Sequence, residues 1–110
     1  MTKRVLILGA GLVSQPIIDY LLEKTDFELT VADILEENAV KAIGQNPRAR
    51  ASALDVNDTE VLGELIAEAD LVVSLLPYTL HPIVARHCLD ARKHMVNASY
   101  VSDEIRAFDA

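Results

Sequence analysis

The stretch LILGAGLVSQP, residues 6–16, decides the fold of this 110-residue chain. Apolar residues lead directly into Gly9-Ala10-Gly11, the start of the glycine loop that follows the first strand of dinucleotide-binding domains. Gly9 permits a tight turn out of the strand, and Gly11 lets backbone N–H groups approach a diphosphate at the positive end of the next helix. We therefore expect Gly9, Gly11, Leu12 and Val13 to form a cofactor-binding loop.

Two residues of the loop differ from the usual glycine pattern. Ser14 stands where a third glycine is expected, but this position chiefly needs a small residue so that helix and strand can pack closely. Pro16 falls in the first helical turn, where few N–H groups have intrahelical partners, so its cost is well below the roughly 3 kcal/mol of an interior proline. The loop is expected to keep its function.

Asp33 supports the same interpretation, because it follows the expected strand 28–32 about 20 residues after the glycines. A carboxylate at the end of a second strand can accept hydrogen bonds from the ribose hydroxyls of NAD and would repel a 2′-phosphate. The preferred cofactor is therefore NAD, with NADP as the alternative. Asp55 and Val56 end a third strand, where they could reach the adenine. The competing interpretations are that Asp33 caps the next helix and that Asp55 assists a cap at Asn57.

Short apolar runs alternate with stretches of helical spacing throughout the chain. The expected strands are 4–8, 28–32, 50–54, 71–75 and 94–97, and the expected helices run from the glycine loop to about 24 and over 35–44, 57–68 and 79–91. Asn57 and Glu60 have capping-box spacing, and Ser102 could cap a final helix. Strands joined through helices predict an α/β fold with right-handed crossovers, a Rossmann-type doubly wound parallel sheet in the order 3-2-1-4-5 and three αβα layers.

Composition predicts one domain, over residues 1–110, with 51% hydrophobic and 25% charged residues. A formal net charge of −7 argues against binding to nucleic acid or to anionic membranes. The single cysteine, Cys88, excludes an internal disulfide and makes a thiolate metal site unexpected. His87 is six residues from His81, which is not the spacing of a helical metal pair, so no metal is assigned. No targeting or membrane-spanning segment is expected, and the predicted location is cytoplasmic.

The segment after the fourth strand should lie where the strand order reverses, which is where ligands bind in such sheets. The backbone of Ser74 and Leu75 is expected to line the nicotinamide ribose, and Leu76 and Pro77 to give the ring an apolar wall. His81 could act as a proton carrier near the substrate, although a structural or solvent-facing role is the competing interpretation.

Four segments resemble the N-terminal nucleotide-binding domain of the saccharopine dehydrogenase family, specifically its glutamate-forming saccharopine reductase branch. They are VLILGAGLVSQP (5–16), LDVND (54–58), DLVVSLLPYTLHPIV (70–84) and KHMVNASYVSDE (93–104). The third and fourth are more specific than the glycine loop. Asp33 departs from the family, whose NADP-using members tend to carry a polar or basic pair there.

The resemblance implies an enzyme that transfers a hydride from the C–N carbon of saccharopine to nicotinamide, giving glutamate and 2-aminoadipate 6-semialdehyde, or that catalyses the reverse. It further implies an amino-acid-derived substrate held partly by the segment after the fifth strand and mainly by a second domain, which could also form a homodimer. The chain alone is expected to be an inactive cofactor-binding fragment. The matching substrate-side residues are Tyr78, His81, Ser99, Tyr100, Val101 and Ser102. A helix cap is the competing role of Ser102.

Two other classes of protein share part of this pattern. Nucleotide-sensing domains of potassium channels and transporters have the glycine loop and the acidic residue, but they do not need segments such as SLLPYTLH or NASYVS. Carboxynorspermidine and homospermidine synthases also act on imines, and only a substrate domain would distinguish them.

Overall fold

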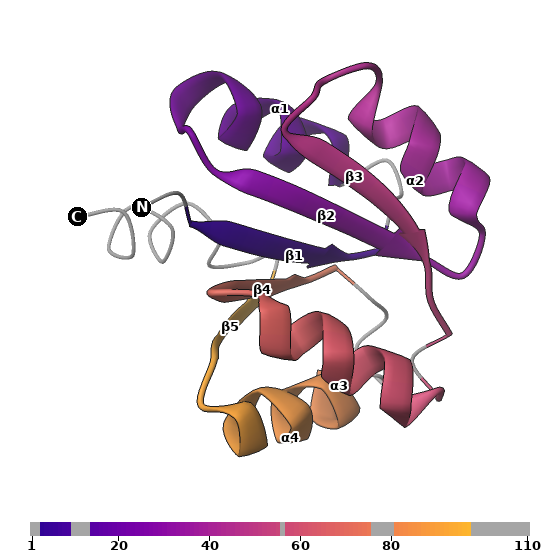
Figure 1. Ribbon diagram of the computed structural model, residues 1–110, viewed down its shortest axis with the longest axis vertical. Helices are drawn as coiled ribbons and strands as arrows, with labels where there is room; N and C mark the ends of the chain where they lie inside the picture. The colour runs from indigo at the N-terminus through magenta and orange to yellow at the C-terminus, as the bar shows by residue number, and fades with distance from the viewer. Residues whose placement is uncertain (1–2, 10–13, 56, 76–80, 98–110) are drawn as a thin grey trace.

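The computed structural model describes residues 3–9, 14–55, 57–75 and 81–97 of the chain. The elements, shown in Figure 1, are β1 (Arg4–Leu8), α1 (Ser14–Lys24), β2 (Glu28–Asp33), α2 (Glu36–Ile43), β3 (Ala49–Ala53), α3 (Thr59–Glu68), β4 (Leu71–Ser74), α4 (His81–Ala91) and β5 (His94–Asn97).

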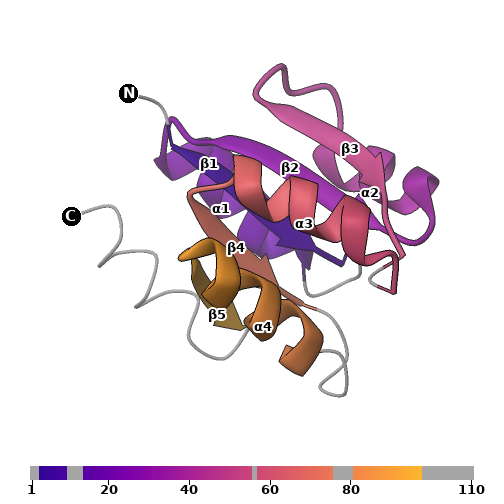
Figure 2. The same ribbon diagram turned by 60° about the horizontal axis from the view of Figure 1, so that its bottom comes forward.

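The strands form one parallel sheet in the order β3-β2-β1-β4-β5, which confirms the predicted topology. Helices α1 and α2 cover one face of the sheet, and α3 and α4 cover the other (Figures 1 and 2). The strand order reverses between β1 and β4, because the chain crosses the sheet through α3 to place β4 on the free side of β1. The carboxyl ends of both strands therefore border the expected ligand site.

Successive residues of β1 belong to two different cores because side chains alternate across a strand. Val5 and Ile7 pack in the α1 and α2 layer, in a cluster that includes the fully buried Ile18 and Leu21. Leu6 and Leu8 pack in the α3 and α4 layer, with residues that include Leu62, Ile66, Val84 and Cys88. Burial on both faces explains why the run VLIL lacks the polar alternation of a surface strand.

The predicted cap of α3 is wrong. The helix begins after Asp58, whose Oδ1 accepts a hydrogen bond from the Val61 N–H at 3.3 Å. Asn57 instead belongs to a turn, since Asp55 Oδ1 accepts from the Asn57 backbone N–H at 2.9 Å and from its side-chain amide at 3.1 Å. That turn delays the first helical residue to Thr59. The start predicted at 79 for α4 and the cap predicted at Ser102 lie outside the described residues.

Arg48 fixes the end of α1 to the start of β3. Its guanidinium donates hydrogen bonds to the carbonyl oxygens of Thr25 (2.7 Å), Phe27 (3.2 Å) and Leu22. The last carbonyls of a helix have no intrahelical partner, so a cation that binds them stabilises the helix end. The turn between α1 and β2 is thereby tied to the third strand.

Candidate dinucleotide-binding site

Gly9 begins the site at the carboxyl end of β1. Its φ of +99° lies in the region that favours glycine, because a side chain would be strained there. Its N–H donates to the Ala32 carbonyl at 2.8 Å, and the Leu75 N–H donates to the Leu8 carbonyl at 2.9 Å. The ends of β1, β2 and β4 are thus held at one level. Gly11, Leu12 and Val13 lie outside the described residues.

Asp33 is the last residue of β2 and is half-buried at the same edge of the sheet. Its Oδ1 accepts a hydrogen bond from the Leu35 N–H at 2.9 Å, which turns the chain before α2. The N-cap of α2 is Leu35 and makes no side-chain capping bond, so Asp33 shapes the turn without itself capping the helix. Ribose binding by Asp33 stays a prediction.

Asp55 follows β3 and is exposed, with its Oδ1 bonded to Asn57 as described above. Its backbone carbonyl also accepts from the Asp58 N–H at 2.8 Å, so this residue organises the entry to α3. Asp55 therefore helps to form the turn before α3, although Asn57 is not the cap that it was expected to assist, and contact with the adenine stays a prediction. Val56 lies outside the described residues.

Ser74 ends β4 at the point where the strand order reverses. Its partners in the sheet are Leu8 of β1 and Asn97 of β5, and it is fully buried. Its Oγ has no hydrogen-bond partner among the described residues. Most buried hydroxyls are hydrogen-bonded, so one without a partner among the described residues needs an explanation, and a functional role is one of those known for such groups. The half-buried Leu75 packs against the α1 and α2 core.

The substrate-side predictions fall largely outside the part of the chain that the structure describes. This applies to Leu76, Pro77, Tyr78, Ser99, Tyr100, Val101 and Ser102. His81 is the first residue of α4, and its side chain is likewise not described. Within the described ranges, no group of three or more His, Cys, Asp and Glu residues is placed to hold a metal ion. None of the helices described is long and apolar enough to cross a membrane.

Gly9, Asp33, Asp55 and Ser74 therefore lie at, or just after, the carboxyl ends of four different strands, at one edge of the sheet. A positive-φ glycine directly after the first strand, an acidic residue at the end of the second and a reversal of strand order define a Rossmann-type dinucleotide-binding domain. The residues present fit such a cofactor, since Gly9 turns the chain out of β1 at a φ that favours glycine, and the buried Ser74 hydroxyl at the reversal has no hydrogen-bond partner among the described residues.

The chain belongs to the saccharopine dehydrogenase NADP binding domain family, whose model matches residues 5–110. It is 38% identical over 109 residues to the saccharopine dehydrogenase (NADP(+), L-glutamate-forming) of Saccharomyces cerevisiae, covering 99% of this chain and 24% of that protein. It is 38% identical over 108 residues to the mitochondrial alpha-aminoadipic semialdehyde synthase of Bos taurus, covering 97% of this chain and 12% of that protein.

A solved structure of a saccharopine dehydrogenase shows the same similarity in three dimensions. The apo saccharopine dehydrogenase (L-Glu forming) from Saccharomyces cerevisiae superposes with a TM-score of 0.79 at 39% identity, over 96% of this chain and 23% of that one. The family predicted from the four segments is confirmed, and the nucleotide-sensor and polyamine-synthase alternatives are not favoured. The chain spans about a quarter or less of the length of these relatives.

A second group of polar residues lies at the amino edge of the sheet and was not predicted from the sequence. Arg4, Thr30 and Arg50 lie on the neighbouring strands β1, β2 and β3, and the register places them on the same face of the sheet. The available signal was one polar side chain within each of the three expected strands. It could not be interpreted without the register between the strands.

Proposed function

We propose that this chain binds a nicotinamide dinucleotide across the carboxyl ends of β1 and β4, as the cofactor domain of an oxidoreductase that acts on the C–N bond of an amino-acid conjugate. The observation that supports this most directly is the left-handed Gly9, hydrogen-bonded to the end of β2 beside Asp33. The relatives named as saccharopine dehydrogenases supply the reaction class.

The cofactor would lie with its diphosphate on the backbone of residues 9–13 and its adenosine ribose at Asp33. When bound, nicotinamide takes up or releases the hydride. The Ser74 hydroxyl and the chain from Leu75 to Pro77 would face the nicotinamide half, and a saccharopine-like secondary amine would approach from the side of Tyr78 and residues 99–102. A second domain would supply most of the substrate contacts and any contact between subunits.

The cofactor preference is a separate part of the proposal. The related yeast enzyme is named for NADP(+), whereas Asp33 here ends β2 with a carboxylate. A carboxylate stabilises ribose hydroxyls as a hydrogen-bond acceptor and repels a 2′-phosphate. We therefore propose that NAD binds more tightly than NADP to this chain.

Thermal unfolding with each nucleotide tests both parts. NAD at about 100 times its Kd should stabilise the protein by about 2.7 kcal/mol, and NADP at the same concentration by less. Asp33→Asn should weaken the preference, because an amide loses the negative charge yet keeps an oxygen for the Leu35 N–H. The matched control is Asp26→Asn, an exposed aspartate just before the other end of β2.

The outcomes separate the two parts. Equal stabilisation of the parent protein by NAD and NADP would refute the preference assigned to Asp33 but leave the cofactor site intact. If neither nucleotide raises the unfolding temperature, the proposed function itself fails.

A further inference from the structure

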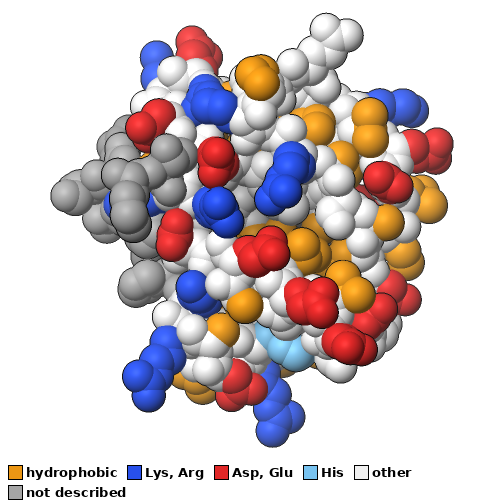
Figure 3. Space-filling view, viewed as in Figure 1, with side chains coloured by type: hydrophobic (Ala, Val, Ile, Leu, Met, Phe, Trp, Pro, Cys, Tyr) orange, Lys and Arg blue, Asp and Glu red, His pale blue; other side chains and the backbone are white. Residues whose placement is uncertain are grey.

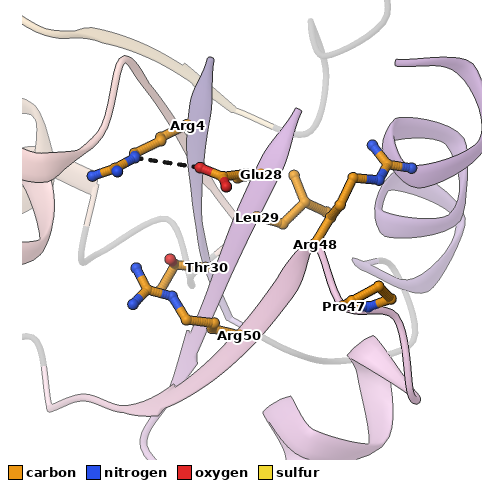
Figure 4. Close-up of a pocket in the computed structure, with 7 residues that line it drawn as sticks. All are labelled: Arg4, Glu28, Leu29, Thr30, Pro47, Arg48 and Arg50. Atoms are coloured by element: carbon orange, nitrogen blue, oxygen red, sulfur yellow. Dashed lines mark ion pairs between the residues drawn. The ribbon is translucent and has the colours of Figure 1, made fainter. Parts of the chain in front are cut away.

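A pocket at the amino edge of the sheet lies at the opposite end of the strands from Gly9 and Asp33. Its volume is about 250 Å³ (Figure 4). The residues that line it are Arg4, Glu28, Leu29, Thr30, Pro47, Arg48 and Arg50. This volume suits a small ion, since pockets for drug-sized ligands begin at about 300 Å³.

Two hydrogen-bond donors of this pocket have no acceptor within the described part of the chain. Thr30 and Arg50 are paired in the β2–β3 register, and Figure 4 shows the Thr30 hydroxyl and the Arg50 guanidinium on the same side of the sheet. No hydrogen bond or ion pair joins either side chain to another described residue. A guanidinium and a hydroxyl together form a donor set suited to an oxyanion.

Arg4 adds a second guanidinium on the same side of the sheet in Figure 4. Its Nε lies 3.4 Å from Glu28 Oε2, an ion pair whose side chains are 57% and 52% exposed. A guanidinium has five N–H donors, so this single contact leaves others for a ligand. Arg48 is not counted among the anion-binding groups, because both of its terminal nitrogens already donate hydrogen bonds to main-chain carbonyls.

Acidic groups reduce the positive charge here. Glu28 lines the pocket, and Glu68 lines a smaller adjoining one with Arg4, Thr30 and Arg50. Figure 3 shows Lys and Arg side chains interspersed with Asp and Glu on the visible face, a distribution unsuited to an extended polyanion. The arrangement favours a single small anion held by hydrogen bonds, with Glu28 competing against it for Arg4.

We propose that this pocket binds one small oxyanion, a phosphate or carboxylate group, between Arg50, the Thr30 hydroxyl and Arg4. The site is independent of the dinucleotide, which would bind at the other edge of the sheet. Its affinity is set by few, partly exposed contacts, so we expect a Kd of about 1 mM.

Titration of the 15N-labelled chain tests this site. Sodium phosphate and sodium succinate are added separately at constant ionic strength, and the amide resonances of Thr30 and Arg50 are followed. A saturating shift with phosphate alone identifies a phosphate site, with succinate alone a carboxylate site, and with both a general oxyanion site. Shifts that rise without saturation, or that sodium chloride reproduces, overturn the proposal.

Substitutions distinguish a specific anion site from a general effect of net charge. Arg50→Gln should weaken binding about tenfold, since it removes a charge-assisted donor, and Glu28→Gln should strengthen it by releasing Arg4. Matched controls on α4, Arg86→Gln and Asp90→Asn, alter exposed charges elsewhere and should leave the Kd unchanged. Equal effects of the site and control variants would mean that only net charge matters, and the proposal would fail. NAD binding is read from thermal shift, so failure at one site is distinguishable from failure at the other.

Discussion

Cys88 illustrates how position alone changes the chemistry of a side chain. The residue is 2% exposed within the core beneath α3 and α4, and burial raises the pKa of its thiol to about 11 from a usual value of 9.0. The thiolate is the reactive form, so a neutral buried thiol should not react. We expect no modification of the folded protein by a thiol reagent such as Ellman's reagent at pH 8, and rapid modification in urea. Prompt reaction of the native protein would show that the helix opens.

The raised pKa of Cys88 also makes the stability of the fold depend on pH, and it fixes the direction of that dependence. The unfolded thiol loses its proton near pH 9, whereas the folded thiol keeps it to about pH 11. The contribution of Cys88 is therefore fully present below pH 9 and is lost as the pH rises toward 11. Urea unfolding of the parent and of Cys88→Ala at pH 7 and pH 10 measures it, because other titrating groups cancel in the difference. The gap in unfolding free energy between the two proteins should be smaller at pH 10.

Residue-level prediction from the sequence succeeded for backbone requirements and failed for local competition between polar groups. Gly9 was identified because a tight turn after a buried strand needs φ above zero, a requirement that follows from chain geometry alone. The segment Asp55-Val-Asn-Asp58 offers three side chains that can accept hydrogen bonds from nearby backbone N–H groups. The choice among them depends on how the chain leaves β3, and that direction is a property of the sheet.

At the scale of the element, the start of α3 provides a direct test of the cap. Asp58→Ala should destabilise the protein by about 1 kcal/mol, since it removes the acceptor of the Val61 N–H. Asn57→Ala removes only the side-chain bond to Asp55 and should cost less. Chemical denaturation of both variants gives the comparison. A larger loss for Asn57→Ala would restore the capping box expected from the sequence.

The elements themselves were largely predictable, because their apolar periodicity is imposed by burial on both faces of the sheet. Their ends were less predictable. The α1 helix buries Ile18 completely, whereas Ile17 is only partly buried against the same core. A difference of one residue rotates the helix by about 100 degrees, and the side chains of two packed layers determine the rotation.

At the scale of the whole molecule, topology followed from the sequence because strand–helix–strand connections are right-handed and pair parallel strands. That rule also brings Gly9, Asp33, Asp55 and Ser74 to one edge without any knowledge of side-chain contacts. The pocket formed by Arg4, Thr30 and Arg50 was not predictable in this way. It arises from register between three strands, and a slip of one residue would send each side chain to the other face.

The sheet order also predicts how stability is distributed. β1 is hydrogen-bonded to strands on both sides and is buried from Val5 to Leu8, whereas β3 lies at one end of the order and has only Ala49 buried. Amide exchange measured by NMR should therefore be slowest in β1 and β4 and faster in β3, because exposed, single-sided strands open without unfolding the core. Saturating NAD should slow the β1 amides further, by the same free energy that the thermal shift reports, since a ligand specific for the native state suppresses global unfolding. β3 amides that exchange as slowly as those of β1 would contradict this gradient. The alternative outcome is that NAD slows exchange only at residues around Gly9. That result would mean that the β1 amides exchange through local opening and not through global unfolding, which would contradict the second prediction.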